Sequence, residues 1–462
     1  MVVIRTSDNA PTEGAVVSSK SPERLSLFGL VVFSSPILIM QAIEIPWRTY
    51  LPSLFATKFG LSLGAVGALM MAIRLFDGVA EPAIAWASDR FPTRWGLRRP
   101  WMAAGAPLIM LGAAGVFFDW PWTGLASLIV ACLVLHLGYV MLVTPHGGWG
   151  LELARDAGER LRITAGKLWF AAAGTIAILL LPSALERGFG IGLEGQVAAL
   201  GMVLLVLCPL IVVIVLRVIP EPDLARGDDA KLANPVSLFV ELARLPGMRR
   251  VLLLQALAGF APAASGAVFL FFVDGGLGLK GWGSTLLLLQ MAVMLVMTPV
   301  WSRFGARFEP RALLALSFGW QLVIAPLVLL LPAGMLAAAI GFLTLRGLFA
   351  GLDFLVLRTM VAEIAHDSAA AGLRCGASCH SACNIAMRLA MGGGAWFALS
   401  LLSMASGDGA ASSINASTAL RVVFVLPSVL VGGLGLVALA VEHLRTVRGS
   451  AGLPPTCCNP SA

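Results

Sequence analysis

Long apolar segments recur along almost the whole chain and are separated by short polar intervals. About twenty apolar residues in helical conformation cross the roughly 30 Å apolar core of a bilayer. Twelve segments reach this length, which predicts twelve membrane-spanning helices. They lie at 25–47, 62–87, 99–119, 122–145, 162–185, 195–219, 249–274, 282–302, 311–330, 332–357, 377–403 and 419–442.

The composition agrees with this pattern. The chain is 58% hydrophobic and 12% charged, and its mean hydropathy is +0.89, whereas a soluble domain carries roughly 25% charged residues. Lipid cannot satisfy backbone hydrogen bonds, so a spanning chain forms helices or a closed barrel. Because the short alternating segments of a barrel are absent, we expect an all-α membrane protein.

Three polar intervals divide the chain. Residues 1–24 form a polar tail without the cleavage site of a signal peptide, and residues 443–462 form a second tail. The longest internal polar interval, 220–248, falls between the sixth and seventh spans. The sequence therefore predicts two six-helix halves, 25–219 and 249–442, joined by a linker at 220–248.

Positive charge is distributed unevenly. A net charge of +7 could indicate an anionic partner such as nucleic acid, but 24 of the 32 Lys and Arg fall in the two tails and the even-numbered loops. This is the positive-inside bias, which places both termini in the cytoplasm of a cell or inner membrane. The partners we expect are the lipid bilayer, a small solute and a coupling cation, with no nucleic acid, and we expect a monomer.

The two halves also carry matching loops. The loop after the second span contains Ser88, Asp89 and Arg90, and the loop after the eighth contains Ser302 and Arg303. Arg90 and Arg303 are separated by 213 residues, close to half the chain. Parallel six-helix repeats around a shared central site resemble the plan of the major facilitator fold.

Buried charges indicate where the chemistry lies. Arg74, Asp77 and Glu81 share one face of the second span. A charge near a helix centre costs roughly 2.5–3.5 kcal/mol on insertion scales, so it usually has a partner and a role. The two carboxylates can jointly hold a cation or share a proton, or the cluster can simply lock the helix to a neighbour.

Other spans carry fewer charges. Glu44 and Arg48 are spaced to pair with each other near the outer surface. In the tenth span, Arg346 and Asp353 share a face, where a mutual ion pair and a substrate role are equally open. Arg388 follows Asn384 by four residues in the eleventh span and needs a carboxylate, for which Asp77 and Glu81 are candidates.

Cysteine chemistry adds little. Cys375, Cys379 and Cys383 form a helical stripe near His380 that favours packing over metal binding. The Cys457–Cys458 pair lies in the tail. We expect no metal and no cofactor. Because the sequence has neither a phosphate-binding loop nor a nucleophile triad, we expect that the protein is not an enzyme.

The second span and the loop after it resemble the glycoside–pentoside–hexuronide:cation symporter family, which includes the melibiose carrier. The motif runs through Gly60-Leu61-Ser62, Arg74, Asp77, Glu81-Pro82, Asp89-Arg90 and Thr93 to Pro100. Softer matches follow at Pro145 to Gly147, Glu159 to Ala165, Met360 to Ile364, Gly372 to Gly376 and Ala386 to Leu389.

The resemblance implies residue roles. The family's cation carboxylates fall on Asp77 and Glu81, and a lysine of its eleventh span falls on Arg388. A sugar-binding carboxylate falls on Gln41, and further ligands fall near Val140 and Val143. The acidic stretch after the tenth span is reduced to Glu363 and Asp367. Because these positions lack the oxygen ligands of the family, the sequence gives less support to a sodium site and to a galactoside site.

We therefore expect a secondary transporter that moves a small organic solute, such as a sugar, glycoside or uronate-like compound, across the membrane by alternating access. It would be coupled to H⁺ or Na⁺ or uncoupled. The cation-coupling candidates are Asp77, Glu81 and Arg74. The substrate-binding candidates are Gln41, Glu44, Trp149, Lys167, Asp353, Asn384 and Arg388. The gating candidates in the cytoplasmic loop are Asp89, Arg90, Arg94, Arg98 and Arg99, although these arginines can serve topology alone. Alternatives are a carrier or exporter of lysolipid or amphipathic compounds, and a non-transporting membrane assembly or pigment-delivery factor.

Overall fold

The computed structural model describes residues 25–91, 93–118, 120, 124–153, 157–221, 247–305, 307–370, 376–406 and 414–451. Within these residues, twelve helical segments are long and apolar enough to cross a membrane, as predicted. They are Leu27–Thr57, Leu63–Arg90, Arg99–Phe117, Leu125–Gly150, Gly158–Phe189, Leu193–Val218, Met248–Gly276, Gly283–Gly305, Pro310–Leu330, Leu336–Val361, Ala382–Ala405 and Ser417–Val441. The predicted linker lies outside the described residues except at its two edges.

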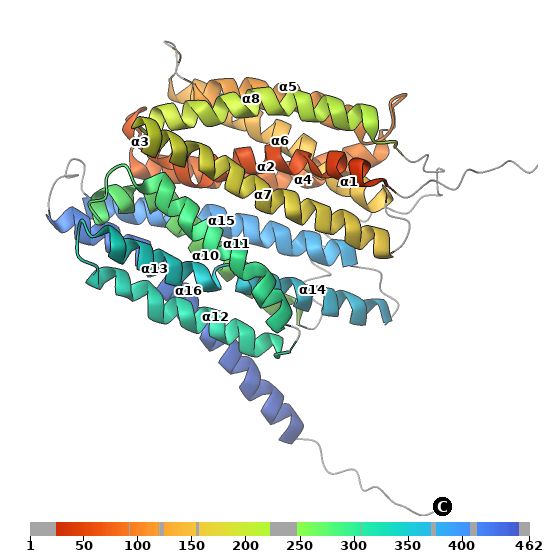
Figure 1. Ribbon diagram of the computed structural model, residues 1–462. Helices are drawn as coiled ribbons and strands as arrows, with labels where there is room; N and C mark the ends of the chain where they lie inside the picture. Colours follow the sequence, from red (N-terminus) through yellow and green to blue (C-terminus); the bar gives the residue numbers. More distant parts are fainter. Residues whose placement is uncertain are drawn as a thin grey trace, which may run out of the picture.

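The helices follow one another without a β-sheet layer in the part of the chain that the structure describes (Figure 1). The N-terminal half contains α1 (Leu27–Ser34), α2 (Pro36–Ile45), η1 (Pro46–Tyr50), α3 (Leu51–Thr57), α4 (Leu63–Arg90), α5 (Arg99–Phe117), α6 (Leu125–Leu153), α7 (Ala157–Phe189) and α8 (Leu193–Val218). The C-terminal half contains α10 (Met248–Phe271), η2 (Phe272–Gly276), α11 (Gly283–Gly305), α12 (Pro310–Ile324), η3 (Ala325–Leu330), α13 (Leu336–Phe349), α14 (Leu352–Ala370), α15 (Gly376–Ser406) and α16 (Ile414–Ala451).

The first span is longer than predicted. Ser26 caps its start, where its side-chain oxygen accepts a hydrogen bond from Gly29 N at 3.0 Å. The predicted end at residue 47 is wrong, because Pro46 begins a π-helical turn and the helix continues to Thr57. Wide turns of this kind occur often at functional sites. This one carries Trp47 and Arg48, which line a cavity together with residues of the C-terminal half.

The tenth span is interrupted. Gly351 has a φ of +81°, a conformation that favours glycine, and it separates α13 from α14. The helical register therefore breaks between Arg346 and Asp353, so the shared face predicted for these residues is wrong.

Close helix contacts depend on small residues. A Cβ atom on Gly112 of α5 would lie 2.4 Å from the backbone nitrogen of Leu135 in α6. One on Gly138 of α6 would lie 2.6 Å from Ile109 N. Without a hydrophobic drive between helices in lipid, such close packing carries much of the association.

The two halves meet along α4 and α15 and along α7 and α11. Figure 1 shows the red-to-yellow half above the green-to-blue half. We call the end with the loops that follow the odd-numbered spans the odd-loop end; it lies near α3. The opposite end, near the start of α1, is the even-loop end.

Candidate functional site

An arginine at the centre of α4 holds two carboxylates. Arg74 donates to both oxygens of Glu44 on α2, at 3.1 Å from Nη1 and 2.7 Å from Nη2. Its Nη1 also donates to Asp77 Oδ2 at 3.1 Å. The two terminal nitrogens of the guanidinium match the planar geometry of a carboxylate, which makes a strong, directional pair. The spacing of Arg74 and Asp77 predicted their shared face, but Glu44 pairs here with Arg74 rather than with Arg48.

The second donor to Asp77 is a histidine. Nδ1 of His136, on α6, lies 3.0 Å from Asp77 Oδ1 and 3.2 Å from Oδ2. Asp77 is 0% exposed and His136 is 1% exposed. Trp47 packs edge-on against the imidazole, with ring centres 4.5 Å apart. Burial of both groups makes this hydrogen bond much stronger than it would be in water.

The second carboxylate of α4 has a different partner. Glu81 forms an ion pair with Arg388 of α15, so this pair joins the two halves. The guanidinium carbon of Arg388 lies 5.8 Å from the ring centre of Tyr139. Both charged side chains are about one-fifth exposed, at 18% for Glu81 and 20% for Arg388. Glu81 is thus the carboxylate partner expected for Arg388. Asp77 and Glu81 pair with different arginines, Arg74 and Arg388.

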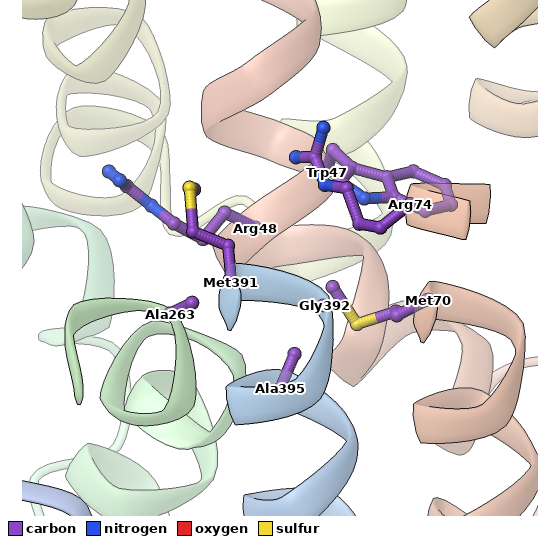
Figure 2. A pocket seen from close by; sticks show the side chains of 8 residues that line it. All are labelled: Trp47, Arg48, Met70, Arg74, Ala263, Met391, Gly392 and Ala395. Carbon is purple, nitrogen blue, oxygen red and sulfur yellow. The ribbon is translucent and has the colours of Figure 1, made fainter. Parts of the chain in front are cut away.

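A small cavity lies between the halves beside these charges. It is lined by Trp47, Arg48, Met70, Arg74, Ala263, Met391, Gly392 and Ala395. Figure 2 shows Arg48 and Arg74 entering from the N-terminal half, opposite Ala263 and Gly392. The cavity has room for about one water molecule. The two halves therefore leave little free space beside the central arginines.

Hydrogen bonds close the odd-loop end. Glu186, near the end of α7, accepts from the backbone nitrogen of Ser284 at 3.3 Å and of Thr285 at 3.0 Å. It also accepts from Thr285 Oγ1 at 3.0 Å. These nitrogens belong to the first turn of α11, where backbone donors lack partners. A carboxylate of one half therefore caps a helix of the other.

Toward the even-loop end, α11 is less buried. The buried residues of α11 are Gly283, Ser284, Leu286, Leu287 and Gln290, all in its first third. Residues 291–305 of the same helix are half-buried or exposed. Burial of α11 is therefore concentrated at the odd-loop end and decreases toward the even-loop end.

The other substrate-binding candidates are scattered. Gln41 donates to Thr175 Oγ1 and, at 3.2 Å, to the carbonyl of Ala171, so it links α2 to α7. Asn384 is half-buried on α15, four residues before Arg388. Of the two, only Asn384 belongs to the helix that carries the Glu81–Arg388 pair.

Two further candidates belong to the packing of the N-terminal half. Trp149 is 0% exposed and contacts Phe33, with ring centres 5.9 Å apart. Lys167 donates to the carbonyl of His146 at 3.5 Å and lies 5.0 Å from the Phe33 ring centre. Their position on α6 and α7 around one phenylalanine favours a structural role over substrate contact.

Arg346 and Asp353, the charged residues of the tenth span, do not form the mutual ion pair that the sequence left open. The guanidinium of Arg346 lies over Phe424, 4.4 Å from the ring centre. Asp353 is 5% exposed and accepts from Phe354 N at 2.9 Å and from Gln321 Nε2 at 3.4 Å. The break at Gly351 accounts for the separation.

The gating candidates build a cluster at the even-loop end. Arg98 pairs with Asp89 and with Glu152 of α6, and donates to Ser88 Oγ at 2.9 Å. Although burial opposes the charge, hydrogen bonding to Glu152 and attraction by both carboxylates raise the pKa of Arg98. These contacts join the loop before α5 to the ends of α4 and α6, within one half.

The remaining loop arginines differ in exposure. Arg99 donates to the carbonyl of Ile219 at 2.5 Å and lies 5.9 Å from the ring centre of Trp149. Arg90 and Arg94 are exposed and lie over Trp86 and Trp95. Their role in gating stays a prediction.

Sequence reasoning missed His136, Tyr139 and Glu186. A histidine inside an apolar span is itself a signal of function, and His136 could have been found on that ground. Glu186 lies near a span end, where an acidic residue is unremarkable until its partner in the other half is known. Cys383 is buried on α15, while Cys375, the tail cysteines and the side chains of Cys379, His380, Glu363 and Asp367 lie outside the described residues.

Comparison with known proteins identifies the family of this chain. The sequence profile of the MFS/sugar transport protein family matches residues 32–442. The uncharacterized symporter YnaJ of Bacillus subtilis (strain 168) is 27% identical over 163 residues, 35% of this chain and 35% of the relative. The putative glycoside/cation symporter YagG of Escherichia coli (strain K12) is 30% identical over 165 residues, 33% of this chain and 36% of the relative. The matched stretch thus spans about a third of each curated relative.

Solved structures share the fold. The nucleoside transporter NupG superposes with a TM-score of 0.65 at 13% identity, covering 90% of this chain and 98% of that chain. A bacterial homologue of the human lysosomal transporter Spinster, in an inward-facing and unoccupied conformation, gives a TM-score of 0.66 at 14% identity, covering 91% and 97%. At such identities the likeness shows the architecture alone.

Proposed function

We propose that this chain, which belongs to the MFS/sugar transport protein family, carries a small glycoside- or uronate-like solute across the membrane together with a cation. It is a multi-pass membrane transporter and not an enzyme. The observation that supports coupled transport most directly is the Glu81–Arg388 ion pair, because it joins the halves at the centre.

The pair supplies a mechanism for coupling. A proton or metal cation that binds at Glu81 competes with Arg388 for the carboxylate. Arg388 would then be released from the N-terminal half, and the halves could rock about the centre. Asp77 belongs to this coupling site through its position one turn before Glu81.

The solute class rests on polar groups near the centre and on relatives. Gln41, Glu44, Asn384 and Arg388 offer donors and acceptors suited to sugar hydroxyl or carboxylate groups. One relative is named a putative glycoside/cation symporter and another a glucuronide carrier protein homolog. Neither the lysolipid alternative nor the assembly-factor alternative is favoured by these relatives.

Orientation follows from charge. The even-numbered loops hold most of the basic residues, so we place the even-loop end and both termini in the cytoplasm. The closed odd-loop end would then face outward, and the structure would represent an inward-facing state.

A binding screen followed by uptake tests this proposal. Purified protein is heated with sugars, glycosides, uronates or lysolipids, and a solute that raises the unfolding midpoint is then offered to proteoliposomes. We expect a glycoside or uronate to stabilise the protein and to accumulate inside when a cation gradient is imposed. Stabilisation by lysolipid alone would contradict the proposed solute class, and binding without uptake would contradict transport.

A further inference from the structure

Arg48 differs from the other central arginines in its partners. It lies in η1 and lines the central cavity together with Arg74. Arg74 is occupied by Glu44 and Asp77, whereas Arg48 forms no hydrogen bond or ion pair with any residue that the structure describes. Glu44 attracts Arg48 from beyond ion-pair distance, because both of its oxygens already accept from Arg74. The guanidinium of Arg48 is therefore left with unused donors.

The wall of this cavity holds no acidic side chain. Besides the two arginines, its lining residues are apolar or small, apart from the indole N–H of Trp47. That nitrogen, Nε1, is buried and has no hydrogen-bond partner among the described residues. Figure 2 shows Arg48 extending away from Trp47 and Arg74, beside Met391 of the C-terminal half. The wall thus presents donors without a negatively charged acceptor.

The stem of Arg48 packs against the C-terminal half. A Cβ atom on Gly266 of α10 would lie 3.2 Å from Cγ of Arg48 and 3.5 Å from its Cδ. Arg48 therefore lies in the seam between the two halves, which alternating access opens. A donor in this seam meets the solute when the halves separate.

We propose that Arg48 binds a carboxylate of the transported solute, so that the solute is a uronate-like monoanion rather than a neutral glycoside. The inference rests on the transport function proposed above and chooses between the two solute classes that it names. A guanidinium matches a carboxylate through two parallel hydrogen bonds. The indole of Trp47 offers one more donor in the same wall.

Charge balance favours a single negative charge on the solute. Three carboxylates near the centre form ion pairs with two arginines. Arg48 supplies the third positive charge, so the group is neutral before the solute binds, with the imidazole of His136 uncharged. A monoanion that enters with a monovalent cation keeps this balance. A neutral solute that enters with the same cation leaves one charge uncompensated in the apolar interior, which is costly.

The test compares probes of similar shape and different charge. Methyl β-D-glucuronide, its methyl ester and methyl β-D-glucoside are titrated against the full-length protein in lipid nanodiscs, and the dissociation constants are measured by calorimetry. The corresponding galacturonide and galactoside separate charge from ring stereochemistry. We expect the unaltered protein to bind at least one free acid about tenfold tighter than its ester or glycoside, because only the acid forms a charge-assisted pair.

Variants of Arg48 assign this preference to its side chain. In Arg48→Gln we expect the affinity for the acid to fall about tenfold and the affinity for the glycoside to stay unchanged, so that the preference disappears. Arg48→Lys keeps the charge but loses the planar donor pair, and an intermediate preference is expected. Lys280→Gln removes the same charge at an exposed site outside the cavity and should keep the full preference.

The comparison of acid, ester and glycoside needs only the unaltered chain, so it holds even where Arg48→Gln fails to fold. Equal binding of acid and ester, binding of none of the probes, tighter binding of the dianion glucose 6-phosphate, or an undiminished preference in Arg48→Gln would overturn the inference. Accumulation of a glycoside without binding of a uronide would overturn it and leave the proposed transport function intact. Arg48-dependent binding of a uronide that is not taken up by proteoliposomes would support the inference and contradict transport.

Discussion

Glu186, near the end of α7, caps the first turn of α11 across the interface, with its Oε2 3.0 Å from the backbone nitrogen of Thr285. Glu81 and Arg388 join the same two halves nearer the centre. The molecule is therefore held at two levels by carboxylates of the N-terminal half. Alternating access requires the contact at the odd-loop end to break while the halves stay associated elsewhere.

The cap predicts a shift in conformational balance. Glu186→Ala removes the acceptor of two helix-terminal donors, so the odd-loop end should open more often. An impermeant maleimide added to intact cells should then label a cysteine introduced at buried Ala263 several times faster than in the parent. Glu194→Ala, at a site 63% exposed on the same end, is the control and should label at the parent rate. Equal rates in both variants would contradict the capping role.

Arg388 should be required for coupling through its charge. Arg388→Gln leaves Glu81 without its cationic partner, and we expect gradient-driven accumulation to fall about tenfold or more. Arg388→Lys keeps the charge but loses the planar fork, so a smaller loss is expected. Uptake in proteoliposomes measures both, and wild-type accumulation by Arg388→Gln would argue against the pair.

Arg74 should matter for stability as well as for transport. Arg74→Gln leaves the buried Asp77 and the half-buried Glu44 without their shared partner, a loss of about 3–5 kcal/mol. The unfolding midpoint in detergent should fall markedly. Arg90→Gln, at an exposed site on the same helix, should leave the midpoint nearly unchanged, and a comparable fall in both variants would contradict the central role of Arg74.

Helix spacing makes a separate prediction. Gly112→Ala introduces a Cβ atom 2.4 Å from Leu135 N, so α5 and α6 must separate at a cost of about 1–3 kcal/mol. Gly188→Ala is the matched control, because nothing lies within 4 Å of its added atom. Thermal unfolding should distinguish the two variants, and equal midpoints would show that the contact is tolerant.

Hydropathy and loop charge predicted the twelve spans, since span length and the hydrogen-bonding demand of lipid are local properties of the sequence. The π-helical turn at Pro46 and the break at Gly351 escaped prediction. Proline and glycine occur inside many membrane helices, and only the surrounding packing decides whether the helix continues.

The centre could be predicted only in part. The spacing of Arg74 and Asp77 placed them on one face, and the depth of Arg388 required a carboxylate. The pairing of Glu44 with Arg74, and of His136 with Asp77, depends on which helices lie side by side, and residue spacing within one span does not contain that information.

The most direct test is uphill uptake by the Asp77→Asn, Glu81→Gln double variant in proteoliposomes, compared with solute exchange in the same vesicles. With both carboxylates neutral, the cation gradient should no longer drive the movement of the halves. We predict that concentrative uptake is abolished while exchange is partly retained. Full concentrative uptake by the double variant would contradict the assignment of Asp77 and Glu81 to cation coupling.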